Sequence, residues 1–187
     1  MAAKSSLKNM VICLSAICMC CSALLAATYA LTLEPIKVAA QNKTNSSLAQ
    51  VLPSFEGNPQ EADIQYNGVS YKYYKADGAG YAIISNTSGF GGTLSLMVGI
   101  TDSGVVYNTV VLSHSETPGL GAKCQSDERF VSQFKQLDPA QQAITLKKDG
   151  GSLDAITAST ITSRAYTLAV SNAVEVYKSI IGGNNNE

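Results

Sequence analysis

Residues Thr93–Leu112 read TLSLMVGITDSGVVYNTVVL and predict two antiparallel strands joined by a tight turn. In the first strand, Thr93–Ile100, every second residue is a large apolar one, as is typical of a strand with one buried face: Leu94, Leu96, Val98 and Ile100. Asp102-Ser103-Gly104 has the residue types of a turn, and Val105–Leu112 is the returning strand. This pair predicts an antiparallel β-meander.

The segments around this pair extend the prediction in both directions. Upstream, β structure is expected from Tyr71–Tyr74 and Gly80–Ser85, followed by a loop at Gly89–Gly92. Downstream, Ser126 is the expected N-cap of a helix whose apolar residues follow at helical spacing: Phe130, Val131, Phe134 and Leu137. A last helix is expected over about Thr162–Ile181, ended by Gly182-Gly183. Strands grouped before helices favour an α+β fold.

The N-terminal segment predicts a membrane anchor. Residues Asn9–Leu33 carry no charge and are long enough to cross a hydrocarbon core of roughly 30 Å. Lys4 and Lys8 precede them, so the positive-inside rule predicts a cytoplasmic N-terminus. We therefore expect a cytoplasmic segment at 1–8, a transmembrane helix at 9–33, a linker and connecting segment at 34–60 and an extracytoplasmic domain at 61–187. A cleaved signal peptide is the alternative.

Composition excludes several classes of function. The 187 residues have a net charge of −1, which gives no basic surface for nucleic acid. His114 is the single histidine, so a histidine-rich metal site is not expected, and no metal ligand is assigned. Four of the five cysteines lie in the apolar N-terminal segment, and Cys124 is predicted to be a buried apolar residue.

Two short segments have residues suited to binding a cofactor. Ser113–Gly121, SHSETPGLG, directly follows a predicted strand, and its glycines allow close backbone approach to a flat ligand. A hydrolase triad within this one loop is not expected, because near neighbours rarely reach triad geometry, and no catalytic residue is assigned. The second segment, Asp154–Ser163, places several hydroxyls at the start of the last helix, where backbone N–H groups suit a phosphate. Its alternative interpretation is an ordinary capped helix start with Ser159 or Thr160 as N-cap.

These two segments, HSETPGLGAK and DAITASTITSRA, with the N-terminal apolar helix and the Gly-rich β region, resemble the G subunits of Rnf ion-translocating electron transport complexes. Those subunits belong to the FMN-binding domain family, which also includes the C subunit of Na+-translocating NADH:quinone reductase. The resemblance covers nearly the whole chain. It implies an antiparallel β-rich FMN-binding domain with flanking helices, preceded by one transmembrane helix.

The resemblance also implies roles for individual residues. The family's flavinylation motif, Asp-x-x-(Thr/Ser)-Gly-Ala-Thr-x-(Ser/Thr), places its modified threonine at Thr160, which would carry FMN through a phosphoester. Ala158 and Ser159 stand where the family usually has Gly-Ala. Asp154 and Thr157 would be recognised by the flavin-transferring enzyme. The other expected FMN-binding residues are Glu116, Thr117, Gly119, Leu120, Gly121, Ser159, Ile161 and Thr162.

The implied function is electron relay by a redox-active subunit that is not catalytic alone. It would work within a ferredoxin:NAD oxidoreductase complex of the inner membrane, with its main domain in the periplasm. The implied partners are a membrane subunit with an iron–sulfur centre, a second flavin subunit and the flavin-transferring enzyme. Two alternatives remain open: a C-type subunit of the quinone reductase or another flavin carrier, and a non-redox anchored binding module with an unmodified Thr160.

Overall fold

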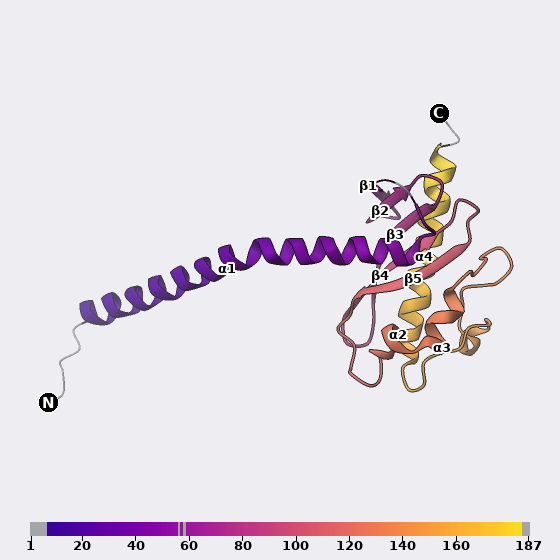
Figure 1. The fold of residues 1–187 in the computed structure, drawn as a ribbon. Coiled ribbons are helices and arrows are strands. Elements are labelled where there is room, and N and C mark those ends of the chain that lie inside the picture. The colour runs from indigo at the N-terminus through magenta and orange to yellow at the C-terminus, as the bar shows by residue number, and fades with distance from the viewer. Residues whose placement is uncertain (1–6, 56, 58, 185–187) are drawn as a thin grey trace. The chain divides into compact units, whose positions relative to one another are not determined.

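The computed structural model of the protein describes residues 7–55, 57 and 59–184 (Figure 1). The chain divides into two compact units between Lys43 and Thr44. Most of the expected cytoplasmic segment, including Lys4, lies outside the described residues.

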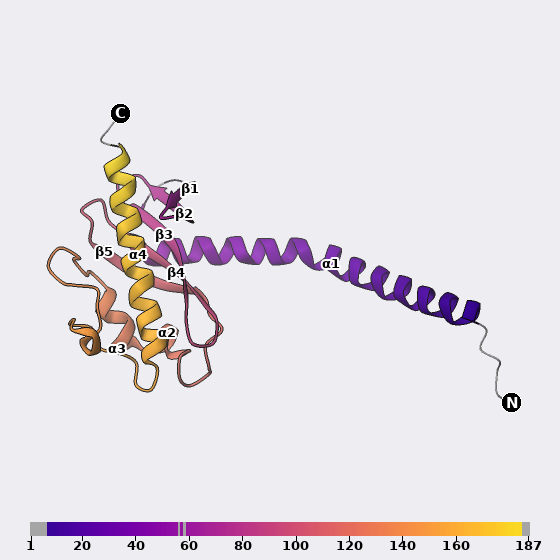
Figure 2. The same cartoon turned by 180° about the vertical axis from the view of Figure 1, so that it is seen from behind.

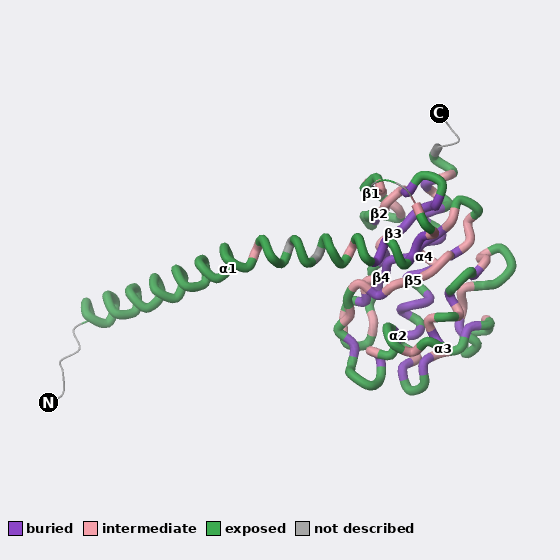
Figure 3. Tube along the Cα trace, in the orientation of Figure 1, coloured by how far each residue is buried: buried purple, intermediate pink, exposed green. Residues whose placement is uncertain are grey.

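Helix α1 (Leu7–Val51) forms the whole of the first unit that the structure describes. It is long and apolar enough to cross a membrane, and none of its most apolar stretch is buried by the rest of the protein (Figure 3). Large apolar side chains lie on its surface, among them Leu14, Ile17 and Leu25. One N-terminal apolar helix of this kind is consistent with a single-pass membrane anchor.

Helix α1 extends further than the sequence predicts. The polar stretch Gln41–Ser47, part of the linker and connecting segment expected at 34–60, is helical in the structure. It contains neither glycine nor proline, so no residue in it breaks a helix. The helix end is then fixed by burial, because Leu48 and Val51 pack into a small apolar cluster with the sheet.

The second unit is built on a five-stranded antiparallel sheet. The strands are β1 (Gln60–Tyr66), β2 (Val69–Ala76), β3 (Gly80–Ser88), β4 (Thr93–Ile100) and β5 (Val106–Ser113). Their order in the sheet is their order in the chain, which confirms the predicted meander. Within the sheet, Val98 of β4 pairs with Ile83 of β3 and Thr109 of β5.

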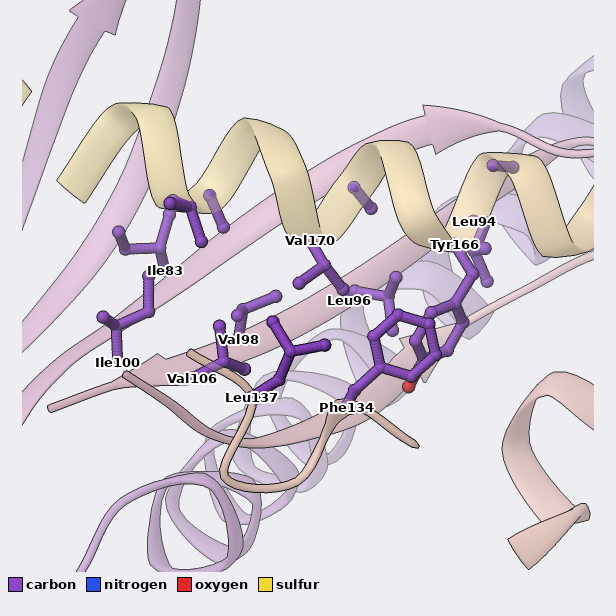
Figure 4. Packing of buried hydrophobic residues seen from close by; sticks show 14 of the residues in the cluster. Ile83, Leu94, Leu96, Val98, Ile100, Val106, Phe134, Leu137, Tyr166 and Val170 are labelled. Carbon is purple, nitrogen blue, oxygen red and sulfur yellow. The ribbon is translucent and has the colours of Figure 1, made fainter. Parts of the chain in front are cut away.

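The two faces of the sheet are covered by different elements. Helix α4 (Thr160–Asn184) lies along one face (Figures 1 and 2), and Figure 4 shows its Tyr166 and Val170 beside Leu96 of β4. Side chains on the other face of the sheet include Ala82 and Met97, which pack against the end of α1. The domain is therefore an α+β layer structure, as predicted.

The helical region after the sheet is more broken than its apolar spacing predicts. In place of one helix capped by Ser126, the structure has α2 (Lys123–Ser126), α3 (Glu128–Val131) and a 3-10 turn, η1 (Ser132–Phe134). Asp127 separates α2 from α3 because its backbone is extended and its carboxylate accepts a hydrogen bond from the Arg129 N–H (3.1 Å). Phe130 and Phe134 are nevertheless buried, and both pack against Tyr166.

Helix α4 also differs from its expected bounds. It begins at Thr160, two residues earlier than predicted, and continues through Gly182-Gly183 to Asn184. Glycine in a helix costs about 1 kcal/mol relative to alanine, which lowers helix stability without forbidding it. The short 3-10 turn η2 (Lys147–Asp149) precedes α4 in the chain. It is joined to the first part of that helix by a hydrogen bond between Asp149 and Arg164.

Candidate functional site

Three segments far apart in the chain line a cavity of about 380 Å³. They are the loop between β3 and β4, the segment that follows β5, and the first turn of α4. The volume of the cavity lies within the range of about 300–1,000 Å³ that is typical of ligand pockets. The lining residues are Phe90, Glu116, Thr117, Leu120, Gly121, Ala158, Ser159, Thr160, Ile161 and Thr162.

The structure brings together most of the residues that the sequence predicts for the site. Eight of the nine expected FMN-binding residues line this cavity, and Gly119 does not. Gly119 has a φ of 77° and forms part of the turn that carries Leu120 over the cavity. Asp154 and Thr157, expected to be recognised by another protein, are exposed and lie outside the lining.

Glu116 joins the three segments that line the cavity. Only 5 % of this residue is exposed. One carboxylate oxygen accepts a hydrogen bond from the Gly91 N–H (3.1 Å) and the other accepts one from the Thr162 hydroxyl (2.6 Å). A buried carboxylate with both oxygens bonded is held rigidly, so Glu116 fixes the β3–β4 loop and the start of α4 in one arrangement.

Gly121 makes this arrangement possible. A β-carbon at this position would lie 2.3 Å from a Glu116 carboxylate oxygen and 2.8 Å from the Thr162 hydroxyl oxygen. Both distances are shorter than non-bonded atoms tolerate. The sequence predicts that this glycine allows a ligand to approach the backbone. The structure shows that the missing side chain allows Glu116 and Thr162 to approach the backbone.

Among the hydroxyls at the start of α4, Thr160 is the accessible one. Ser159 and Thr162 are 8 % and 0 % exposed, whereas Thr160 is partly exposed and lines the cavity. Ser163 is buried, donates to the Ser159 carbonyl (2.9 Å) and accepts from the Ile156 N–H (2.9 Å). Thr160 has a different neighbour, because its hydroxyl oxygen accepts a hydrogen bond from the Lys148 ammonium group (3.0 Å).

Three residues of the site are absent from the predicted FMN-binding residues: Phe90, Ala158 and Lys148. Phe90 is 69 % exposed and, with Leu120 and Ile161, forms an apolar rim on the cavity. An aromatic residue between glycines in the Gly89–Gly92 loop is the sequence signal that could have indicated it. Lys148 has no such signal, since it lies twelve residues before Thr160 and reaches it only through the tertiary fold.

Ala158 is in the left-handed backbone region, with a φ of 60°. The β-carbon makes this conformation cost an L-residue about 1–2 kcal/mol, and glycine lacks that penalty. We therefore expect Ala158→Gly to raise the free energy of unfolding by about 1 kcal/mol. Thermal or denaturant unfolding of the variant measures this, with Ala155→Gly as a control that changes the same atoms in the same loop. A lower free energy of unfolding in Ala158→Gly than in the wild type would contradict the strain inferred for the Ala158 backbone.

Cys124 and Tyr166 lie behind the site in the core, and both are fully buried. Burial, reinforced by the nearby Glu116 charge, raises the pKa of the Cys124 thiol to about 11. Burial also raises the pKa of the Tyr166 hydroxyl, which shares a 2.7 Å hydrogen bond with Thr109. Both groups are therefore neutral at physiological pH, in agreement with Cys124 as a buried apolar residue.

The raised pKa predicts an unreactive thiol. At pH 8 about one Cys124 in a thousand is a thiolate at a pKa of about 11, against about one in four for an ordinary cysteine. We expect iodoacetamide to alkylate Cys124 at least 100-fold more slowly in the folded protein than in the denatured one. Peptide mapping by mass spectrometry measures this, and equal rates in the two states would contradict it.

Comparison with known proteins assigns the class of protein. The FMN-binding domain family matches residues 89–175, which include all three segments of the cavity. The G subunit of the proton-translocating ferredoxin:NAD(+) oxidoreductase complex of Clostridium ljungdahlii is 40 % identical over 106 residues, 55 % of this chain and 56 % of that protein. The matched part thus spans about half the length of that relative.

Longer matches define the particular family. The G subunit of the ion-translocating oxidoreductase complex of Methanosarcina acetivorans is 35 % identical over 163 residues, 82 % of this chain and 85 % of that protein. The corresponding protein of Vibrio cholerae is 36 % identical over 169 residues, 81 % of each chain. The chain belongs to the family of G subunits of ion-translocating oxidoreductase (Rnf) complexes and contains the FMN-binding domain.

Proposed function

We propose that this chain is an electron relay in an ion-translocating ferredoxin:NAD oxidoreductase complex, and that it carries FMN bound covalently through a phosphoester to Thr160. One observation carries the proposal. Thr160 presents the accessible hydroxyl of the α4 start, at the edge of a cavity that lies within the FMN-binding region. The buried Ser159 and Thr162 hydroxyls are poorer candidates for modification.

The residues around the cavity are suited to the two ends of FMN. The phosphate would be held at Thr160, where the first backbone N–H groups of α4 have no partner within the helix. The flat ring would lie against Phe90, Leu120 and Ile161, the apolar rim of the cavity. When bound, FMN supplies reversible electron transfer, and the protein contributes its position and surroundings.

A covalent link would keep the flavin from dissociating from such an exposed site. The apolar rim is exposed to solvent, and a flavin held there by non-covalent contacts alone could dissociate. A domain on the outer face of the membrane would lose that flavin from the cell. A phosphoester prevents the loss without a deep pocket, while the ring stays accessible to electron-transfer partners.

We further propose an orientation and partners for the chain. Lys4 and Lys8 before the apolar stretch favour a cytoplasmic N-terminus, with the transmembrane helix at 9–33 and the FMN-binding domain at 61–187 in the periplasm. Its redox partners would be a membrane subunit with an iron–sulfur centre and a second flavin subunit. The exposed Asp154 and Thr157 would be recognised by the flavin-transferring enzyme.

In-gel fluorescence of the protein from its native membrane tests this proposal. A flavin that remains on the denatured chain, together with co-purification of other redox subunits in mild detergent, is the expected result. A colourless protein that purifies without such partners would contradict it, and would favour a non-redox anchored module.

A further inference from the structure

Three cationic side chains surround the start of α4, and two of them are paired with carboxylates. The Lys147 ammonium group lies 2.8 Å from a carboxylate oxygen of Asp154. The Arg164 guanidinium group binds both carboxylate oxygens of Asp149, at 2.6 and 2.9 Å. The charges of these two residues are therefore largely balanced within the domain.

Lys148 differs from its two neighbours. Among the described residues it makes no ion pair within 4 Å, and its ammonium group instead donates to the Thr160 hydroxyl oxygen (3.0 Å). An ammonium group is a point charge that suits a phosphate, and a hydroxyl balances none of its charge. The Asp149 carboxylate is near enough for Arg164 and, more weakly, Lys148 to lower its pKa, but its two oxygens are bonded to Arg164.

The position of Lys148 is set by the fold. The turn η2 is joined to the segment before α4 by a backbone hydrogen bond from the Lys147 N–H to the Leu153 carbonyl (2.7 Å). The Asp149–Arg164 pair joins the same turn to the first part of α4. The turn that carries Lys148 is thus bonded to one residue before Thr160, Leu153, and to one residue after it, Arg164.

We propose that Lys148 is the charge partner of the FMN phosphate at Thr160, a positioning residue for the cofactor. This inference rests on the proposed function. In a phosphoester the phosphorus is bonded to the Thr160 oxygen that Lys148 already contacts, so the charged phosphate oxygens come within reach of its flexible side chain. Lys148 would also attract the phosphate of FMN before any bond forms.

Binding of two flavins to unmodified protein tests the proposal. Full-length protein made without the flavin-transferring enzyme, in detergent at low salt, is titrated with FMN and with riboflavin, which lacks the phosphate. Lys148→Gln is expected to weaken FMN binding about five-fold and to leave riboflavin binding unchanged. Lys148→Arg should restore FMN binding. Lys178→Gln, the same change on an exposed lysine at the far end of α4, should have no effect.

A second measurement follows the initial rate at which the flavin-transferring enzyme modifies each variant. Lys148→Gln should be modified about five-fold more slowly than the wild type, and Lys148→Arg at nearly the wild-type rate. Added salt should reduce the wild-type rate more than that of Lys148→Gln, because it screens the charge.

The outcomes separate this inference from the function on which it rests. Unchanged FMN binding and modification in Lys148→Gln, or equal weakening of FMN and riboflavin, would overturn the role of Lys148 while Thr160 remains modified in the wild type. A wild-type chain that stays unmodified at Thr160 in the presence of an active transferring enzyme would overturn the proposed function itself.

Discussion

Thr160→Ala is expected to abolish covalent flavin completely and to leave the domain folded. The substitution removes the hydroxyl that would form the phosphoester. It also removes a single hydrogen bond to the exposed Lys148 side chain. Loss of such a surface contact changes the free energy of unfolding by about 0.5 kcal/mol or less. In-gel flavin fluorescence and intact mass report the flavin, and circular dichroism reports the fold.

Ser159→Ala is the matched control, because it deletes the adjacent hydroxyl in the same motif. Ser159 is buried, and its side-chain oxygen is 3.5 Å from that of Thr162. This variant should keep its covalent flavin. Flavin retained by Thr160→Ala and lost by Ser159→Ala would move the attachment site to Ser159 and contradict the assignment from exposure.

Glu116→Ala is expected to lower the free energy of unfolding by about 3 kcal/mol and to reduce flavin incorporation at least ten-fold. The substitution leaves the Gly91 N–H and the Thr162 hydroxyl without their partner and opens a void between three segments. An unsatisfied buried polar group such as the Thr162 hydroxyl costs about 1–3 kcal/mol, and the part-buried Gly91 N–H and the void add to this cost. Thermal unfolding followed by circular dichroism measures the stability, and intact mass after modification measures the flavin.

Two further variants test whether the loss of stability in Glu116→Ala comes from its lost hydrogen bonds. Glu116→Gln keeps the shape of the side chain, and its amide can accept from Gly91 and donate to the Thr162 oxygen, so we expect a loss of about 1 kcal/mol. Glu128→Ala removes an exposed carboxylate from nearby α3 and should be neutral. If Glu116→Ala were as stable as Glu128→Ala, Glu116 would not be the residue that joins the three segments.

Strand β4 could be predicted from sequence because every second residue is large and apolar, although the structure buries residues on both of its faces. Leu94, Leu96 and Val98 all point into the core from β4, whose observed bounds match the predicted ones. Strand β1 has a weaker signal, since its sequence QEADIQY contains mostly polar residues. It is a strand because its backbone pairs with β2 along seven residue pairs, a tertiary effect that a local pattern does not contain.

Helix ends were harder to predict because local and tertiary effects compete there. Apolar spacing predicted one continuous helix from Ser126 to about Leu137. In the structure the Asp127 carboxylate caps α3, which ends at Val131, and the chain continues as the 3-10 turn η1 before it becomes extended at Lys135. At the end of α1, the burial of Leu48 and Val51 outweighs the polar character of the residues before them. In both places capping or packing, and not apolar spacing alone, sets the helix ends.

The residues of the site could be predicted where they lie next to one another in a short sequence motif. Thr160, Ile161 and Thr162 are consecutive, and the Glu116–Gly121 segment is equally compact, so both entered the prediction as units. The hydrogen bond between Glu116 and Thr162 spans 46 positions, and the one between Lys148 and Thr160 spans 12. These long-range contacts, which join the segments of the site and place Lys148 beside Thr160, required the structure.

The most direct test of this account is the mass of the protein purified from its native membrane, followed by mapping of the modified peptide. We expect a mass increase equal to FMN less one water, located on Thr160. An unmodified Thr160 from cells in which the flavin-transferring enzyme modifies another substrate would contradict it.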